Sequence, residues 1–373
     1  MSYTALARRY RSTGFDDIVG QEPIAKTLQA AIKADRVAHA YLFTGTRGVG
    51  KTTMARVFAK ALNDTTPEIE QAIMSGQDTD VIEIDGASNN SVDDARELIA
   101  NSVYRPMKGP YKIYIIDEVH MLSTAAFNAL LKTMEEPPEH VKFILCTTES
   151  HKLPATIQSR CQRYDFRAIP MPVIADRLGF VVKNEKLKAE PELLSMVARL
   201  GNGSMRDALS IMDRLMASGE KKLTVELLEG LMGLAPRELV GTLIDAFADG
   251  DPSPALDAAG KLIATGTGPD QVFESLIERL RDLMVLSACG PETTLVELTG
   301  DARNDEIERA KRFDAAGIVH MIALCENAQR AAKSSPNPRA LMDALIVRLA
   351  MSEKLADVTT LVAQLQGAGA GKA

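Results

Sequence analysis

The feature that most constrains the fold is the glycine-rich loop at residues 45–52, GTRGVGKT, which matches the phosphate-binding pattern GxxxxGK followed by Ser or Thr. An apolar run at residues 40–44 precedes the loop and predicts a buried strand, and residues 53–62 have the apolar spacing of a helix. This order predicts a phosphate site, where backbone N–H groups and the positive end of a helix dipole face an anion. A plain glycine turn is the alternative, and the complete pattern disfavours it.

The residues of this loop are expected to divide the work of binding a phosphate. Gly45, Gly48 and Gly50 let the backbone curl toward the anion. Lys51 would reach the terminal phosphates, and the Thr52 hydroxyl would hold a magnesium ion. The predicted set is completed by neighbouring residues of the loop and the helix start, Thr46, Val49 and Thr53.

Length and composition are typical of a globular protein with several domains. The 373 residues exceed one typical core and suit two or three domains. No apolar run approaches the roughly 20 residues that cross a bilayer, and residues 1–12 lack the apolar core of a signal peptide. We therefore expect a cytoplasmic protein with no membrane partner.

Charge and cysteine content disfavour two classes of function. The net charge of −7 and the pI near 5.5 argue against a protein that coats nucleic acid by bulk attraction, although one face can still carry a basic stripe. The four cysteines are scattered and form no CxxC pair, so the sequence predicts neither a zinc site nor a disulfide framework.

Strand-like and helical runs alternate in the first part of the chain. This alternation predicts an α/β domain over residues 1–170, with a parallel sheet covered by helices on both faces. The expected strands are 41–44, 81–85, 112–117, 141–147 and 164–166.

Beyond Pro170 the strand-like runs end and the pattern becomes helical. Residues 171–232 predict a small bundle in which Ser204 caps a helix at 205–216. Residues 233–360 are helical again, and 361–373 form a flexible tail rich in Gly and Ala. Breaks between the later helices are expected at Pro236, Gly250–Pro252, Gly266–Pro269 and Pro336–Pro338.

A second phosphate-site element is the apolar run Lys112–Ile116, which ends in the two acids Asp117 and Glu118. The run is too short for a helix and predicts a strand whose tip lies beside the glycine loop. Asp117 would hold magnesium through its water shell, and Glu118 would polarise an attacking water. The alternative is a solvated acidic turn, which the complete glycine loop disfavours.

Three further residues carry weaker signals. Thr148 follows an apolar strand and would bond the γ-phosphate or the attacking water, although adjacent threonines are common in strands. Arg160 offers a planar fork for phosphate oxygens, but an isolated arginine is usually a surface residue. Arg206 falls in the first turn of a helix, where a bound phosphate would offset the unfavourable dipole. An ion pair of Arg206 with Asp207 or another acid is the alternative.

Several motifs occur in one order, and together they resemble a known family. They are FDDIVGQ at 15–21, the glycine loop, IDGAS at 84–88, DEVHMLS at 117–123, FNALLKTMEEPP at 127–138, SRC at 159–161 and GSMRDAL at 203–209. The chain resembles the gamma/tau family of the bacterial DNA polymerase III clamp loader, which consists of AAA+ ATPases. The resemblance is dense over residues 1–215 and looser afterwards.

The resemblance implies an architecture and an activity. An AAA+ module would be followed by a helical lid at 171–232 and an all-α collar at 233–360, where five subunits pack into a ring. ATP and Mg²⁺ would be the cofactors, and other clamp-loader subunits, a sliding clamp and primer–template DNA would be the partners. The implied activity is that of a motor, in which ATP binding and hydrolysis load the clamp onto primed DNA.

The resemblance also implies residue roles. Thr148 is similar to the first sensor of the family and Arg206 to the second, and Arg160 is similar to the arginine finger that acts on ATP in a neighbouring subunit. Lys132 is similar to a lysine that faces the DNA channel and relays DNA contact to Glu118. The residues expected near the adenine are Tyr10, Arg11, Val19 and Gly20.

Three departures from the family pattern matter. No four-cysteine module follows Asn63, so no zinc is expected. Ser12 stands where the family has a proline after Tyr-Arg, in the loop beside the adenine. The chain also ends soon after the expected collar, as in the short form of the family or in a chain truncated at that boundary.

Two alternatives to the motor stay open. One is a scaffold subunit that binds nucleotide poorly and contributes only to the geometry of the ring. The intact Lys51, Thr52 and Asp117 favour the motor over this scaffold. The other is a different AAA+ machine, such as a branch-migration helicase, which would need a C-terminal DNA-binding domain.

Overall fold

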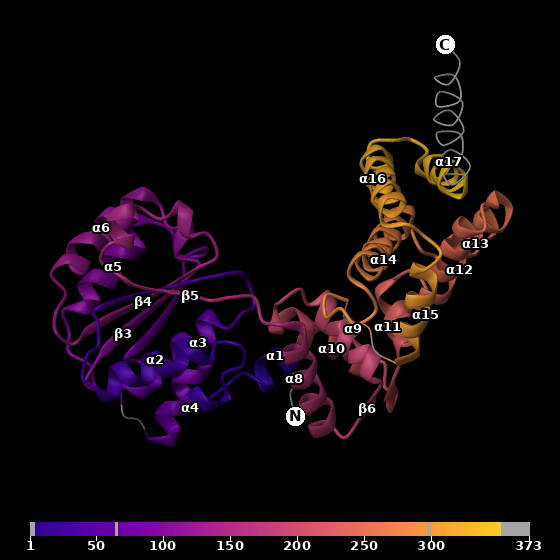
Figure 1. Cartoon of the computed structure of the whole chain (residues 1–373). Coiled ribbons are helices and arrows are strands. Elements are labelled where there is room, and N and C mark those ends of the chain that lie inside the picture. The colour runs from indigo at the N-terminus through magenta and orange to yellow at the C-terminus, as the bar shows by residue number, and fades with distance from the viewer. Residues whose placement is uncertain (1–3, 64–65, 297, 299, 352–373) are drawn as a thin grey trace, which may run out of the picture. The chain divides into compact units, whose positions relative to one another are not determined.

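The computed structural model describes residues 4–63, 66–296, 298 and 300–351 (Figure 1). The chain divides into two compact units, residues 1–222 and residues 223–373. The finer division that the sequence predicts, with boundaries at 170, 232 and 360, stays a prediction, and the tail at 361–373 lies outside the described residues. Among the described helices, none combines the length and apolarity that a membrane crossing requires.

A five-stranded sheet forms the centre of the first unit. Its strands are β1 (Ala40–Thr44), β2 (Val81–Asp85), β3 (Lys112–Asp117), β4 (Val141–Thr147) and β5 (Gln162–Asp165). They lie in the order β2-β3-β4-β1-β5, and every neighbouring pair is parallel. The carboxyl ends of the strands therefore meet at one edge, which is where open parallel sheets place their binding sites.

Two features of the strands differ from the sequence prediction. Strand β5 begins at Gln162, before the predicted start at Tyr164, because it is an edge strand in which only Tyr164 is buried. The expectation that strands end at Pro170 is wrong, since β6 (Lys188–Ala189) and β7 (Lys222–Leu223) form a two-stranded sheet. These two strands are too short to give the alternation by which a strand is found in a sequence.

Helices cover both faces of the five-stranded sheet, as predicted (Figure 1). Alternation along β1 explains the two cores, since Tyr41 and Phe43 join one core and Ala40 and Leu42 join the other. The first core is covered by α2 (Glu22–Lys33), α3 (Lys51–Leu62) and α4 (Pro67–Ser75), and the second by α5 (Val92–Ser102) and α6 (Thr124–Glu135).

Short helical turns and a small bundle complete the first unit. The turns are α1 (Leu6–Arg9), η1 (Phe15–Asp17), η2 (Val119–Met121), η3 (Ser150–Lys152) and α7 (Ala155–Gln158), and the bundle helices are α8 (Met171–Asn184), α9 (Pro191–Leu200) and α10 (Met205–Met216). As predicted, Ser204 caps α10, because its hydroxyl accepts a hydrogen bond from the Asp207 N–H. Helix α1 packs against α10, which places the N-terminal segment beside the bundle.

Helices build the second unit, and their starts explain the predicted breaks. They are α11 (Val225–Met232), α12 (Arg237–Ala248), α13 (Pro252–Ala264), α14 (Pro269–Cys289), α15 (Gly300–Ala310), α16 (Ala315–Ala332) and α17 (Pro338–Ala350). Pro252, Pro269 and Pro338 each stand at the start of a helix, where the missing N–H of proline costs nothing. Phe247 and Phe273 belong to the apolar core of this unit.

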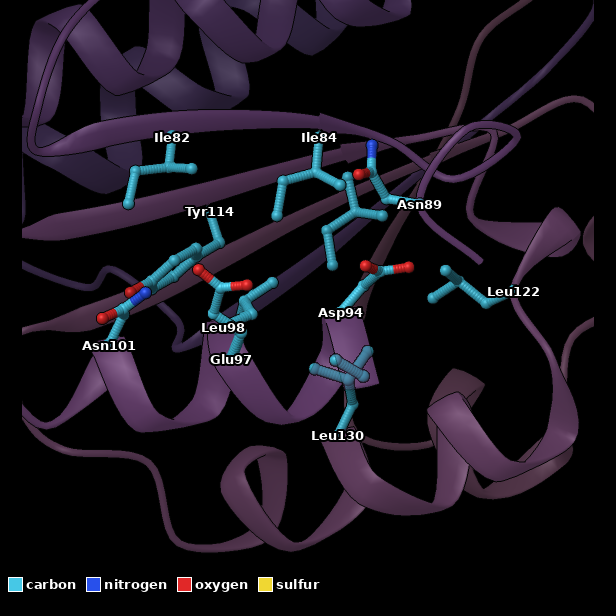
Figure 2. A pocket seen from close by; sticks show the side chains of 12 residues that line it. Ile82, Ile84, Asn89, Asp94, Glu97, Leu98, Asn101, Tyr114, Leu122 and Leu130 are labelled. Carbon is cyan, nitrogen blue, oxygen red and sulfur yellow. The ribbon is translucent and has the colours of Figure 1, made fainter. Parts of the chain in front are cut away.

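A cavity of about 180 Å³ lies between strands β2 and β3 and helices α5 and α6 (Figure 2). Its lining is mainly apolar, and Asp94 and Glu97 add carboxylates. The Tyr114 hydroxyl faces no hydrogen-bond partner among the described residues, and burial raises the pKa of Tyr114 to about 12. The cavity shares no lining residue with the site described next.

Candidate nucleotide-binding site

The glycine loop joins β1 to α3 in a conformation that its glycines permit. Gly45, Gly48 and Gly50 have φ angles of 145°, 77° and 101°. A Cβ on Gly45 would lie 2.4 Å from the carbonyl oxygen of Phe166, and one on Gly48 would lie 1.8 Å from the Ser204 hydroxyl oxygen. Gly45 and Gly48 therefore require glycine for two reasons, the positive φ and the close approach of neighbouring segments, and Gly50 requires it for the positive φ alone.

Lys51 begins α3 and is 5 % exposed. Its Nζ donates to the carbonyl oxygens of Gly45 at 2.8 Å and Thr46 at 2.9 Å. Burial lowers the pKa of Lys51, and the nearby carboxylates Asp117 and Glu118 oppose that shift. A buried ammonium group that is bonded only to carbonyl oxygens is suited to an anionic ligand.

The two expected magnesium ligands lie in contact. The Thr52 hydroxyl donates to Asp117 Oδ2 at 2.6 Å. Asp117 stands at the carboxyl end of β3, and Glu118 follows it in the left-handed region with a φ of 45°. Thr148 reaches this tip from the end of β4, where its hydroxyl donates to Glu118 Oε2 at 3.1 Å. The folded chain thus joins the glycine loop to both predicted acids.

These residues lie around a cleft of about 820 Å³ within the first unit. Most of the predicted nucleotide-binding residues line it: Tyr10, Arg11, Val19, Gly48, Val49, Gly50, Lys51, Thr52, Thr53 and Arg206. Asp117 and Glu118 line it as well. Gly45 and Thr46 stand behind the cleft and bond Lys51, and Gly20 precedes the lining residue Gln21.

The cleft is strongly cationic, and the sequence analysis missed several of its arginines. Arg8, Arg47, Arg56 and Arg177 line it together with Arg11 and Arg206. Arg47 lies inside the glycine loop and was therefore detectable. Arg8 and Arg177 come from α1 and α8, and only the folded chain brings them together. Burial lowers the pKa of Arg11, and the charges of neighbouring arginines add to the shift.

Arg160 and Lys132 lie outside this cleft, whereas Arg206 lines it. Arg206 lies in the first turn of α10 as predicted, and within the described part of the chain it forms no ion pair with Asp207. Arg160 is held by the carboxylate of Glu135 and by the carbonyl oxygen of Thr156 and does not line the cleft. Lys132 lies exposed on α6, and no contact among the described residues joins it to Glu118, so the relay remains a prediction.

Comparison with protein families assigns most of the chain. Residues 20–170 match a model described as DNA polymerase III, delta subunit. Residues 173–221 match the ATPase lid domain of the DNA polymerase III clamp loader subunit. Residues 223–365 match domain III of DNA polymerase III subunits gamma and tau.

Curated relatives give the same result. The chain is 40 % identical over 359 residues to DNA polymerase III subunit tau of Bacillus subtilis, with 94 % of this chain and 63 % of that protein covered. It is 38 % identical over 296 residues to DNA polymerase III subunit gamma of Buchnera aphidicola, with 77 % of this chain and 81 % of that protein covered. The chain thus spans less than two thirds of the length of the Bacillus protein.

Among solved structures, the Thermotoga maritima RuvB Holliday junction branch migration motor matches 63 % of this chain and 78 % of its own, with 19 % identity and a TM-score of 0.47. At this identity and score, the match carries no argument about function. The glycine loop, the acid pair and the three consecutive family matches lead to one assignment. The chain belongs to the gamma/tau family of bacterial DNA polymerase III clamp-loader subunits.

Proposed function

We propose that this chain is an ATP-driven motor of a DNA polymerase III clamp loader, which loads a sliding clamp onto primed DNA. The observation that carries the proposal is the convergence of Lys51, Thr52, Asp117 and Glu118 on one cationic cleft. A triphosphate needs a cationic environment, a metal ligand and a base at one place, and the residues of this cleft would supply all three.

The residues fit ATP with magnesium. Oxygen atoms are the ligands that Mg²⁺ prefers, and Thr52 Oγ1 and Asp117 Oδ2 lie 2.6 Å apart and would hold it together. A magnesium ion held by these two residues would supply positive charge that offsets the negative charge of the phosphates. Lys51 and Arg206 would bind the phosphates from the two sides of the cleft, while Tyr10 and Arg11 would lie near the adenine.

Glu118 would act as the base for the attacking water, with Thr148 beside it. A single acceptor bond from Thr148 leaves further lone pairs on the carboxylate for a water proton. Arg160, which lies outside this cleft, would serve as the arginine finger for ATP bound to a neighbouring subunit. Lys132 would face the DNA.

The partners follow from the family and from charge. Other clamp-loader subunits would form a pentameric ring with this chain, with residues 171–232 as the lid and 233–360 as the collar. The sliding clamp and primer–template DNA would be the other partners, in the cytoplasm. Because the net charge is −7, DNA binding is expected only in the assembled, ATP-bound state.

The test is the ATP hydrolysis rate of the assembled complex, with and without primed DNA and clamp. We expect hydrolysis that rises when both are present. A matched complex carrying Glu118→Gln should bind ATP and lose hydrolysis. If the wild-type chain binds no nucleotide, the motor assignment is wrong and the scaffold alternative holds.

A further inference from the structure

His120 lies beside the cleft without lining it. It belongs to the η2 turn that follows the acid pair, and 6 % of its side chain is exposed. A buried imidazole requires partners for its ring nitrogens. The structure supplies them from the tip of β3 and from the end of β4.

Both nitrogens of His120 meet oxygen atoms. Nδ1 lies 3.0 Å from Thr147 Oγ1 and 3.4 Å from Glu118 Oε2. Nε2 lies 3.0 Å from Glu149 Oε2. A ring nitrogen that carries a hydrogen can donate to a carboxylate, which when ionised only accepts hydrogen bonds. The ring is therefore held between two carboxylates, and one of them is the expected base.

The far side of His120 is itself anchored. Lys152 Nζ donates to Glu149 Oε2 at 2.8 Å, and the Glu149 N–H donates to Thr147 Oγ1 at 3.0 Å. The imidazole cannot turn without losing its contacts to Thr147 and Glu149. Fixed partners of this kind are what orient a functional group before it reacts.

The contacts of His120 restrain one oxygen of the Glu118 carboxylate. Its Oε2 is contacted by Thr148 at 3.1 Å and by His120 at 3.4 Å. Its Oε1 has no hydrogen-bond or ion-pair partner within the described ranges, so this oxygen can accept a proton. The backbone of Glu118 is left-handed and nonglycine, which means that neighbouring contacts hold it in place.

We propose that His120 is a positioning residue, which fixes Glu118 Oε2 so that Oε1 can receive the proton of the attacking water. This inference rests on the proposed ATPase function and adds a residue to it. His120 touches no substrate and acts through Glu118. Its partners Thr147 and Glu149 hold the imidazole in the orientation that this task requires.

The test compares wild type with His120→Ala, His120→Asn, Glu118→Gln and the double variant His120→Ala/Glu118→Gln in the assembled complex. For His120→Ala we expect kcat to fall roughly 10- to 100-fold, as is typical when the partner of a functional group is removed. The Kd for ATP should stay within about twofold, because the substitution removes no contact with the nucleotide. His120→Asn retains a short polar group and should recover part of the rate.

The double variant separates positioning from a merely structural role. If His120 acts through Glu118, its removal should have no further effect once Glu118→Gln is present. His151→Ala is the matched control, since His151 is 75 % exposed and lies 3.9 Å from Glu149; its rate should equal that of wild type.

Additive losses in the double variant overturn the proposal, as does an unchanged or raised kcat for both His120 variants. Circular dichroism identifies a variant that fails to fold, and His120→Asn then decides the question. A wild-type complex without ATP hydrolysis refutes the motor function itself, and the role of His120 falls with it. If Glu118→Gln loses hydrolysis while both His120 variants keep the wild-type kcat, the motor function stands and only the role of His120 is refuted.

Discussion

The cleft of the first unit and the helical core of the second unit both bury charged side chains, yet they neutralise them differently. In the cleft, Lys51 meets only backbone carbonyl oxygens, and Arg56 is the one lining arginine that holds an ion pair among the described residues. In the helical unit, Glu306 is 1 % exposed and meets the guanidinium groups of Arg279 and Arg309.

This difference distinguishes charged side chains that bind a ligand from those that stabilise the fold. A buried charge is costly unless an opposite charge or hydrogen bonds compensate it. The Glu306 cluster is compensated within the chain, so its role is to hold α14 and α15 together. Apart from Arg56, the cleft's arginines and Lys51 hold no ion pair within the described residues, so an anionic ligand can supply the opposite charge that they lack.

Arg160 gives the strongest test of whether an ion pair within the chain marks an arginine as structural. It is ion-paired with Glu135, like a structural arginine, yet we predict a catalytic role in trans. Arg160→Ala should lower the ATP hydrolysis rate of the assembly by roughly 10³- to 10⁵-fold, the range for arginine fingers. The measurement is single-turnover hydrolysis, with ATP binding at the chain's own cleft measured separately.

The matched control for Arg160 is Arg163→Ala, since Arg163 is also a surface arginine paired with an acid, Asp165. It should leave the rate unchanged. Full activity of Arg160→Ala would contradict the trans role, and Arg160 would then belong with the structural arginines.

The Glu306 cluster should show the largest effect on stability. Glu306→Gln leaves Arg279 without its carboxylate, while Arg309 keeps Asp245, and breaking a buried pair in this way costs about 3–5 kcal/mol. Hydrogen exchange of α14 and α15 measures the change locally, which matters because the two units need not unfold together. Glu308→Gln on the same helix is the control, since Glu308 is exposed, and equal losses in both variants would refute the role of burial.

Substitution of Lys51 should lower ATP affinity and leave stability unchanged, the reverse of what is expected for Glu306. Lys51→Ala removes the buried ammonium group that would meet the phosphates, and truncating one partner of such a pair costs about 2–5 kcal/mol. This corresponds to a loss of roughly 30- to 5,000-fold in ATP affinity. The thermal midpoint without nucleotide should not fall, because no carboxylate is left unpaired. Lys60→Ala, on the same helix and paired with Glu70, is the control in nucleotide titrations; unchanged affinity of Lys51→Ala would refute the site.

How far the sequence predicts this molecule depends on how local each signal is. The glycine loop and the strand ending in Asp117 were found because spacing and apolar runs lie within a few residues. The two-residue strand β6 and the polar start of the edge strand β5 have no such signal. Arg177 was missed because only the packing of separate segments brings it to the cleft.

For the weaker candidates as well, the sequence identifies the residue, and only the fold shows which group it contacts. Thr148 was predicted to bond a phosphate or a water, and the structure shows its hydroxyl on Glu118. The contact depends on the parallel pairing of β3 with β4, which aligns their ends. Spacing along the chain identifies the residue type, and the sheet register decides which group it meets.

Arg56 tests the comparison inside the cleft itself, with the smallest expected effect. Although it lines the cleft, its guanidinium forms a two-pronged pair with Glu83, at 2.6 and 2.8 Å, and also bonds the carbonyl oxygen of Met74. Arg56→Ala should therefore lower the free energy of unfolding by about 1.5–3 kcal/mol, as expected for charged hydrogen bonds.

The ATP affinity of Arg56→Ala should change by roughly threefold at most, less than the tenfold that 1.4 kcal/mol represents. Arg47→Ala is the matched contrast, since Arg47 is an exposed cleft arginine with no ion pair among the described residues. It should weaken ATP binding more than Arg56→Ala does and leave stability unchanged. Urea unfolding and nucleotide titration of both variants decide the matter. If Arg56→Ala weakens binding more than Arg47→Ala, pairing within the chain does not separate structural from ligand-binding arginines in this cleft.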